Sequence, residues 1–321
     1  MRDKLAEKRV KKKRSGDNLL LDKSSDFLKD ELKNFQEIFS SIKPSSGEFP
    51  EIDGIDIFGG SMPLNGIAGG DHIIYIDFNR RYDMERRIRE AKEAGNLIVA
   101  EKLNEMRSRA GILIADVSGH KITDALMAAM LHQSFLVGVL YELDQYGEIT
   151  GDLFENLNSR FYRSSSFSKF ITMIYGEISV DGMFRFINAG HPSPVVFSNR
   201  FNKLIKVCLN RVVNFPPIGT LPSRDDIDSS RNFSRLGFKK KYSVNKINLM
   251  GKGDILLLFT DGLIEHGIEE KEPYFNEALE NILRSVKESS AKDIFHRIKE
   301  DLKKYSEPSD DISFVVIKKK K

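Results

Sequence analysis

Cysteine is nearly absent from this sequence, which has Cys208 alone among 321 residues. A single cysteine can form neither an internal disulfide nor a zinc site built from several thiolates, and this scarcity is typical of proteins in a reducing cytosol. A secretory signal peptide is not predicted either, because the charged start of the chain is not followed by an apolar segment. We therefore expect a cytoplasmic protein.

Long apolar runs are scarce as well. The most apolar stretch, residues 125–143, carries His132, Gln133 and Ser134 near its centre, whereas a membrane span needs ~20 mainly apolar residues. The stretch predicts a helix buried inside a globular domain, so we expect no transmembrane segment. The composition, 40% hydrophobic and 30% charged, is that of an ordinary globular protein, and the chain is long enough for a sizeable core.

The net charge of +3 conceals an uneven distribution. Residues 1–14 carry a net charge of +6 and residues 318–321 carry +4, which leaves the body between these ends at −7. An acidic body argues against a nucleic-acid-binding surface, and we expect no nucleic-acid partner. Residues 1–18 are predicted to form a disordered basic tail, because charged chain ends are usually solvated.

Residues 19–45 are predicted to form a linker or regulatory helix that ends at Pro44. Its apolar residues step by sevens, fours and threes: Leu21, Leu28, Leu32, Phe35, Phe39 and Ile42. This spacing is typical of a coiled-coil seam, although it extends over only about two heptads. Two interpretations stay open: two copies of the chain pair as a homodimer through residues 21–42, or the helix packs on its own domain.

The body of the chain, residues 46–318, shows grouped strands and helices. Strands are predicted at 55–58, 73–78, 112–117, 170–178, 183–188, 194–197, 204–207, 255–260 and 312–317, and helices at 123–143, 152–162, 276–288 and 291–305. Residues 80–109 indicate two charged helices joined by a Gly-Asn turn, and residues 223–246 indicate a loop. This pattern predicts an α+β domain with largely antiparallel sheets.

Four aspartates recur at the ends of apolar strands: Asp71, Asp116, Asp261 and Asp310. Any one of them could be a turn or cap residue. Taken together, short carboxylates on rigid strand ends are the oxygen ligands that Mg²⁺ and Mn²⁺ prefer. Four buried carboxylates would repel one another and raise their pKa values, so a dication is their natural partner. Spacing alone does not show that they converge.

Seven motifs follow one another along the chain: Gly-Gly-Asp (69–71), Ala-Asp-Val-Ser-Gly-His (115–120), Phe-Ile-Thr-Met (170–173), Asn-Ala-Gly-His-Pro-Ser-Pro (188–194), Pro-Ile-Gly (217–219), Gly-Asp-Ile-Leu-Leu-Leu-Phe-Thr-Asp-Gly (253–262) and Asp-Asp-Ile-Ser (310–313). In these motifs the chain resembles the metal-dependent protein phosphatase (PPM) family, and within it the bacterial, SpoIIE-like type. The resemblance covers about residues 35–317. It implies a β-sandwich of two mainly antiparallel sheets flanked by helices, to which residues 80–109 add a helical insertion and residues 223–246 a loop insertion.

The resemblance also implies a site for two divalent cations, Mn²⁺ or Mg²⁺. Asp116 corresponds to the ligand shared by both ions, and the backbone carbonyl of Val117 helps to hold one of them. Asp71 corresponds to a ligand of the ion on that side, and Asp261 and Asp310 to ligands of the other. Three further residues are expected to support these ligands from behind: Gly70, Gly262 and Asp311, the last of which stands where many relatives have asparagine.

The implied reaction is hydrolysis of phosphoserine or phosphothreonine on a protein, by in-line attack of a metal-activated water. It requires no side-chain nucleophile. His191 is a candidate general acid for the leaving oxygen, although a histidine in a turn is more often structural. The implied substrate is a phosphorylated, STAS-type antagonist of an anti-sigma factor in a bacterial partner-switching pathway, although no residue of this chain identifies it.

Two other functions fit part of the pattern. A nucleotide cyclase can carry Gly-Gly-Asp beside a hairpin, but here His72 and Ile73 follow that motif, and the later motifs would have no explanation. A non-catalytic interaction module could keep the same fold, although all four aspartates are present. The family pattern itself is broken after Asp71, since Asp77 is displaced, which leaves the substrate side of that region open.

Overall fold

The computed structural model describes residues 27, 29–31, 33–35, 37–38, 42, 49–64, 69–119, 122–164, 169–207, 212–225, 229–231, 233–268 and 272–320. Contacts within the chain divide it into two units, residues 1–42 and 43–321. In the first unit every described residue from 27 to 38 is helical, and the regulatory role expected for residues 19–45 stays a prediction. The predicted tail, residues 1–18, lies outside the described residues, as does Cys208.

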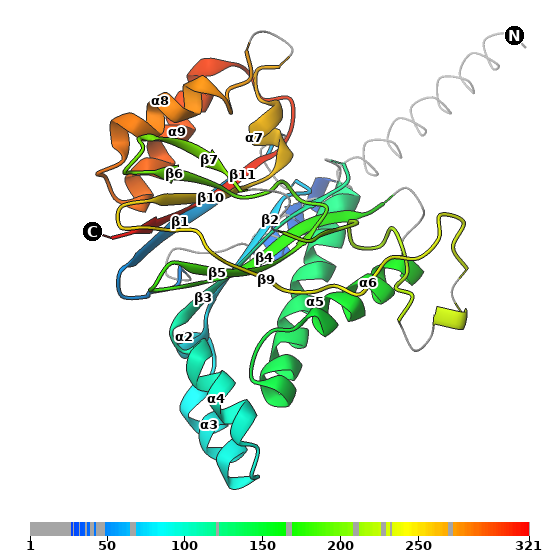
Figure 1. Cartoon of the computed structure of the whole chain (residues 1–321). Helices are drawn as coiled ribbons and strands as arrows, with labels where there is room; N and C mark the ends of the chain where they lie inside the picture. Colours follow the sequence, from blue (N-terminus) through cyan, green and yellow to red (C-terminus); the bar gives the residue numbers. More distant parts are fainter. Residues whose placement is uncertain are drawn as a thin grey trace, which may run out of the picture. The chain divides into compact units, whose positions relative to one another are not determined.

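Two β-sheets form the second unit (Figure 1). The first sheet contains, in spatial order, β1 (Ile55–Met62), β11 (Ile312–Lys319), β10 (Ile255–Phe259), β6 (Val195–Ser198) and β7 (Lys203–Lys206). The second contains β2 (His72–Asp77), β3 (Arg109–Val117), β4 (Ile171–Ser179), β5 (Met183–Ala189) and β8 (Asn214–Phe215), with β9 (Asn245–Asn248) also paired to β5. Among these strand pairs, β5 and β8 run parallel and the others run antiparallel. The predicted α+β class with mainly antiparallel sheets is confirmed.

The sheets pack face to face across a shared apolar core. Successive side chains of a strand point to opposite faces, so Leu256 and Leu258 of β10 enter the core between the sheets. Leu257 and Phe259 face the other way and pack against helices. Burial of both faces explains why β10 is apolar throughout, although its neighbours run antiparallel to it.

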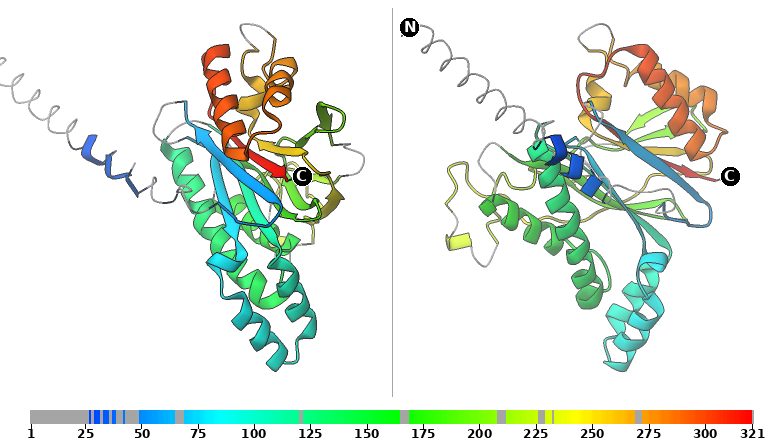
Figure 2. Two further views of the ribbon diagram at one scale, coloured as in Figure 1. Left: turned by 90° about the vertical axis from the view of Figure 1, so that its left-hand side faces the viewer. Right: turned by 180° about the vertical axis from the view of Figure 1, so that it is seen from behind.

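Helices cover the outer face of each sheet (Figures 1 and 2). α8 (Glu277–Val286) and α9 (Ala291–Tyr305) lie on the first sheet, and α5 (Ile122–Tyr146) and α6 (Gly151–Ser164) lie on the second. α5 faces its sheet with fully buried residues at helical spacing, among them Leu131, Phe135 and Val139. By length and composition residues 124–146 could also cross a membrane; in this fold one side of the helix packs against protein.

A helical arm projects from one end of the second sheet (Figure 1). It comprises α2 (Phe78–Arg81), α3 (Met84–Glu93) and α4 (Leu97–Met106), which lie between β2 and β3. The Gly-Asn turn falls where it was predicted: Gly95 adopts a φ of +76°, and the side chain of Asn96 accepts a hydrogen bond from Val99 N. Leu103 and Met106 of α4 are buried, so the arm packs against the domain.

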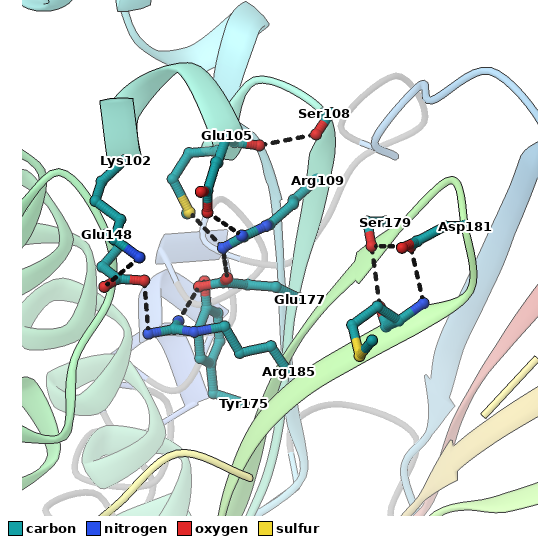
Figure 3. A network of polar contacts seen from close by, with 12 residues as sticks. Lys102, Glu105, Ser108, Arg109, Glu148, Tyr175, Glu177, Ser179, Asp181 and Arg185 are labelled. Carbon is teal, nitrogen blue, oxygen red and sulfur yellow. Dashed lines mark hydrogen bonds and ion pairs between the residues drawn. The ribbon is translucent and has the colours of Figure 1, made fainter. Parts of the chain in front are cut away.

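An ion-pair network holds the base of this arm to the sheet (Figure 3). The side chain of Glu177 on β4 is fully buried and accepts hydrogen bonds from Arg109 of β3 and Arg185 of β5, both at 3.1 Å. Arg109 also pairs with Glu105 of α4 at 2.7 Å, and Arg185 pairs with Glu148 at 3.0 Å. One buried carboxylate therefore links three strands and, through Arg109, the arm.

Two boundaries drawn from the sequence are corrected. The segment 80–109 runs into β3, which begins at Arg109, because pairing with β4 extends the strand beyond its apolar run. The segment 223–246 includes the start of β9 at Asn245. This strand is mostly polar, and its pairing with β5 has no signal in the local sequence. The short helix α7 (Asp261–Glu265), which follows β10 after Thr260, was not predicted.

Candidate metal centre

The segments that carry the four aspartates meet at one end of the two sheets. Asp71 precedes β2 and Asp116 lies near the end of β3, while Asp261 follows β10 and Asp310 precedes β11. Antiparallel pairing of β2 with β3 brings Asp71 near Asp116 on one sheet. The pairing of β10 with β11 brings Asp261 near Asp310 on the other. Thr260 joins the sheets at this end, because its hydroxyl donates a hydrogen bond to Asp71 Oδ2 at 2.8 Å.

Gly70 lies very close to the backbone of the loop after β3. A Cβ atom on Gly70 would lie 2.5 Å from the carbonyl oxygen of Val117, 2.6 Å from that of Gly119 and 3.1 Å from Asp116 Oδ1. The carbonyl of Gly70 also accepts a hydrogen bond from Val117 N at 3.2 Å. Only glycine lets the backbone before Asp71 lie this close to the loop after β3. We name this arrangement of Gly70, Asp116, Val117 and Gly119 the oxygen cradle.

Asp311 ties two further segments to the oxygen cradle. Its Oδ1 accepts a hydrogen bond from Leu64 N at 2.7 Å, and its Oδ2 accepts one from Gly70 N at 2.9 Å. Its backbone carbonyl lies so close to Gly262 that a Cβ atom there would overlap it. Asp311 N in turn donates to the carboxylate of Asp310 at 2.7 Å. These contacts are compatible with the supporting role predicted for Asp311, Gly70 and Gly262.

The aspartates influence one another electrostatically. Burial raises the pKa of Asp116 to about 8, with further contributions from the charges of Asp261 and Asp310. Burial also raises the pKa of Asp71, and the charge of Asp116 adds to this effect. Each shift has the cause expected for carboxylates that share a buried site. The four predicted ligands are therefore electrostatic neighbours.

The chemistry of the donors fits hard divalent cations. Carboxylates and main-chain carbonyl oxygens are the ligands that Mg²⁺ and Mn²⁺ select, and the oxygen cradle leaves no room for a side chain at Gly70. Among the described residues, no three acidic or histidine side chains are gathered closely enough to form a ready-made metal-binding group. The assignment of metal ligands therefore stays a prediction.

A lysine beside the oxygen cradle was not predicted as part of the site. Lys169 Nζ donates a hydrogen bond to the carbonyl of Ser118 at 2.8 Å and forms an ion pair with Asp124, whose side chain is fully buried at the start of α5. Both groups lie against Gly119, where a Cβ atom would be 2.6 Å from Asp124 Oδ2 and 2.9 Å from Lys169 Nζ. The pair clamps the loop after β3 to α5. Its two residues are 45 positions apart, so no local pattern predicts it.

His191 lies one strand away from Asp116. Its Nδ1 is 3.1 Å from the hydroxyl of Thr172, which faces Asp116 in the pairing of β3 with β4. Its backbone N–H donates to Asn188 Oδ1 at 2.8 Å. Burial lowers the pKa of His191 to about 3, so the ring is neutral near pH 7. A neutral imidazole is a poor general acid, so the ionisation of His191 gives no support to the general-acid role, which stays a prediction.

The fold is that of PP2C-type phosphatases. The SiaA-PP2C domain of Pseudomonas aeruginosa superposes with a TM-score of 0.60 and 14% identity, over 92% of this chain and 98% of that one. The PP2C phosphatase domain of SpoIIE from Bacillus subtilis, with a fragment of its regulatory domain, superposes with a TM-score of 0.55 and 14% identity, over 84% of this chain and 64% of that one. The predicted β-sandwich of the PPM type is confirmed.

The sequence defines the family more closely. The family model of stage II sporulation protein E (SpoIIE) matches residues 107–320, more than half of the chain, so the protein belongs to this family. The phosphoserine phosphatase RsbP of Bacillus subtilis (strain 168) is 26% identical over 213 residues, which are 65% of this chain and 45% of RsbP. The chain thus spans less than half the length of this relative. Asp71 lies outside the family match, and its place beside Asp116 rests on the contacts of Gly70 and Thr260.

Proposed function

We propose that the protein is a metal-dependent phosphatase that hydrolyses phosphoserine or phosphothreonine on a protein substrate. The observation that carries the proposal is the oxygen cradle, in which the carboxylate of Asp116 and the carbonyl of Val117 face the backbone that leads into Asp71. Membership of the SpoIIE family and the PP2C-type fold support the same class of reaction.

Oxygen donors from four segments would hold two ions, Mn²⁺ or Mg²⁺: Asp71, Asp116, the carbonyl of Val117, Asp261 and Asp310. When bound, such ions supply the charge that activates water and stabilises phosphoryl oxygens during an in-line displacement. The chain's own task is to keep the donors in place. Asp311 fixes the backbone of Gly70, and the ion pair of Lys169 with Asp124 fixes the loop that directly follows Val117.

For the substrate we propose a phosphorylated, STAS-type antagonist of an anti-sigma factor in a partner-switching pathway. Support comes from relatives: RsbP is a phosphoserine phosphatase, and a chain of Mycobacterium tuberculosis that superposes with a TM-score of 0.58 at 18% identity contains RsbU and RsbW domains. This chain spans 64% of that one. The cytoplasmic location and the homodimer through residues 21–42 stay predictions.

A hydrolysis assay tests the proposed function. The purified chain of 321 residues is incubated with para-nitrophenyl phosphate and with a phosphoserine peptide, in Mn²⁺, in Mg²⁺ and in EDTA. We expect hydrolysis of both compounds with a divalent cation, its loss in EDTA and its loss in Asp116→Asn. The exposed Asp53→Asn serves as the matched control and should keep full activity.

Two outcomes would overturn the proposal. If neither compound is hydrolysed with either ion, the chain is a non-catalytic module with a phosphatase fold. If the protein instead converts GTP and Mg²⁺ to a cyclic dinucleotide, the Gly-Gly-Asp motif belongs to a nucleotide cyclase.

A further inference from the structure

A mainly apolar cavity of about 370 Å³ lies on the outer side of the first sheet. Its walls come from the loop after His191, from α7 and the turn that follows it, and from the segment before α8. Phe259 and Phe275 are packed together with ring centroids 4.7 Å apart and line the cavity. Ile268 also lines it and has 52% of its surface exposed. The volume lies in the range of ligand-binding cavities, ~300–1,000 Å³.

Three chain segments connect this cavity to the candidate metal centre. Phe259 directly precedes Thr260, whose hydroxyl binds Asp71. Ile264 lines the cavity from α7, the helix that begins at Asp261. The third segment is the loop of His191 and Pro192. Pro192 lines the cavity, and His191 Nδ1 lies 3.1 Å from the hydroxyl of Thr172. The cavity and the centre therefore flank the first turn of α7 at the same end of β10.

The exposed side chain of Ile268 and the apolar wall of this partly open cavity are in contact with water, which is unfavourable for apolar surface. Removing apolar surface from water is favourable, so a partner that places an apolar side chain here gains binding free energy. Lys206 also lines the cavity, from the edge strand β7. Because Phe259 and Ile264 line the cavity and Asp261 lies between them in the chain, the partner best placed to fill it is the substrate.

We propose that this cavity is a specificity site for the phosphoprotein substrate and binds one large apolar side chain, such as leucine or phenylalanine, close in sequence to the phosphorylated residue. The inference rests on the proposed function, since it assigns the occupant from the neighbouring metal centre. It adds a requirement that a metal centre alone does not impose: a phosphorylated residue without an apolar neighbour at the right spacing is a poor substrate.

A leucine scan tests the proposal. Phosphoserine peptides with a background of alanine and serine carry a single leucine that is moved position by position along both sides of the phosphoserine. We expect leucine at one or two adjacent positions to raise kcat/KM by about tenfold or more, as the filling of an apolar pocket does. Para-nitrophenyl phosphate, which has no such side chain, is measured in parallel.

Variants then locate the effect. Ile268→Asn should lower the ratio of kcat/KM for the best leucine peptide to that for para-nitrophenyl phosphate by about tenfold. Ile98→Asn, which changes another exposed isoleucine (72% exposed) near the tip of the arm, should leave the ratio unchanged. A flat leucine scan with active protein, or an equal effect of both variants, would overturn the specificity site and leave the proposed function standing. Absence of all hydrolysis would instead overturn the proposed function, and the specificity site with it.

Discussion

Burial raises the pKa of Asp116, and the like charges of Asp261 and Asp310 raise it further. Asparagine has the same shape without the charge, so it should relieve repulsion in the metal-free protein and weaken the hold on a cation. We expect Asp116→Asn to abolish Mn²⁺-dependent hydrolysis while the free energy of unfolding in EDTA stays equal or rises. Urea denaturation followed by circular dichroism measures the second quantity. A large loss of stability in EDTA would show that Asp116 is a structural residue.

Gly70 tests the oxygen cradle without any change of charge. An added methyl group would lie 2.5 Å from the Val117 carbonyl, so Gly70→Ala must move the backbone before Asp71 away from the loop after β3. We expect at least a tenfold rise in the Mn²⁺ concentration that gives half-maximal activity, and a loss of about 1–3 kcal/mol in stability.

The control for Gly70→Ala is Gly251→Ala, in the turn before β10, where the nearest atom to an added Cβ is a carboxylate oxygen of Asp254 at 3.2 Å. That variant should keep the wild-type Mn²⁺ dependence. If Gly70→Ala also kept it, the cradle would not be part of a metal site.

At the scale of elements, the buried carboxylate of Glu177 joins β3, β4 and β5 (Figure 3). Glu177→Gln would leave Arg109 and Arg185, whose side chains are 13% and 12% exposed, with less negative charge nearby. Because removing one partner of a buried pair costs about 3–5 kcal/mol, we expect a loss of this size in the free energy of unfolding. Arg109 starts β3 and Asp116 lies near its end, so the ion-pair network and the candidate metal centre are at opposite ends of this strand. Folded Glu177→Gln should therefore bind Mn²⁺ normally.

An exposed pair on the same arm provides the comparison. Glu85 and Arg107 are 3.4 Å apart with side chains 79% and 40% exposed, and such pairs contribute ~0–1 kcal/mol. Glu85→Gln should therefore change stability by less than ~1 kcal/mol. Similar losses in Glu177→Gln and Glu85→Gln would show that the network contributes little.

The strands and helices that pack into the core could be predicted from the sequence, because burial imposes a period on their apolar residues. β10 and α5 are examples, since β10 is apolar throughout and α5 turns Leu131, Phe135 and Val139 to the core at helical spacing. β9 and α7 could not be predicted: β9 is mostly polar and exists through its pairing with β5, and α7 is a single short helix. Likewise, the aspartates could be named from motifs, whereas the clamp of Lys169 on Asp124 depends on tertiary contact alone.

At the scale of the whole molecule, the aspartates of the candidate metal centre link the folding equilibrium to proton binding and to metal binding. Burial and like charge raise the pKa of Asp116 to about 8 in the folded chain, against about 3.9 for an unperturbed aspartate. Between these two values the folded state holds a proton that the unfolded state has lost. The stability of the metal-free protein should therefore fall as pH rises from about 4 to about 8, and level off above that range.

A divalent cation should reverse this trend, because it binds the carboxylates only after their protons leave. We expect the melting temperature in EDTA to be lower at pH 8 than at pH 6, and the gain in melting temperature on adding Mn²⁺ to be larger at pH 8. A free Mn²⁺ concentration a hundredfold above Kd stabilises the folded state by about 2.7 kcal/mol. In Asp116→Asn both dependences should flatten. A melting temperature in EDTA that rises between pH 6 and pH 8 would mean that the aspartates do not share a buried site, because separated carboxylates would ionise well below this range.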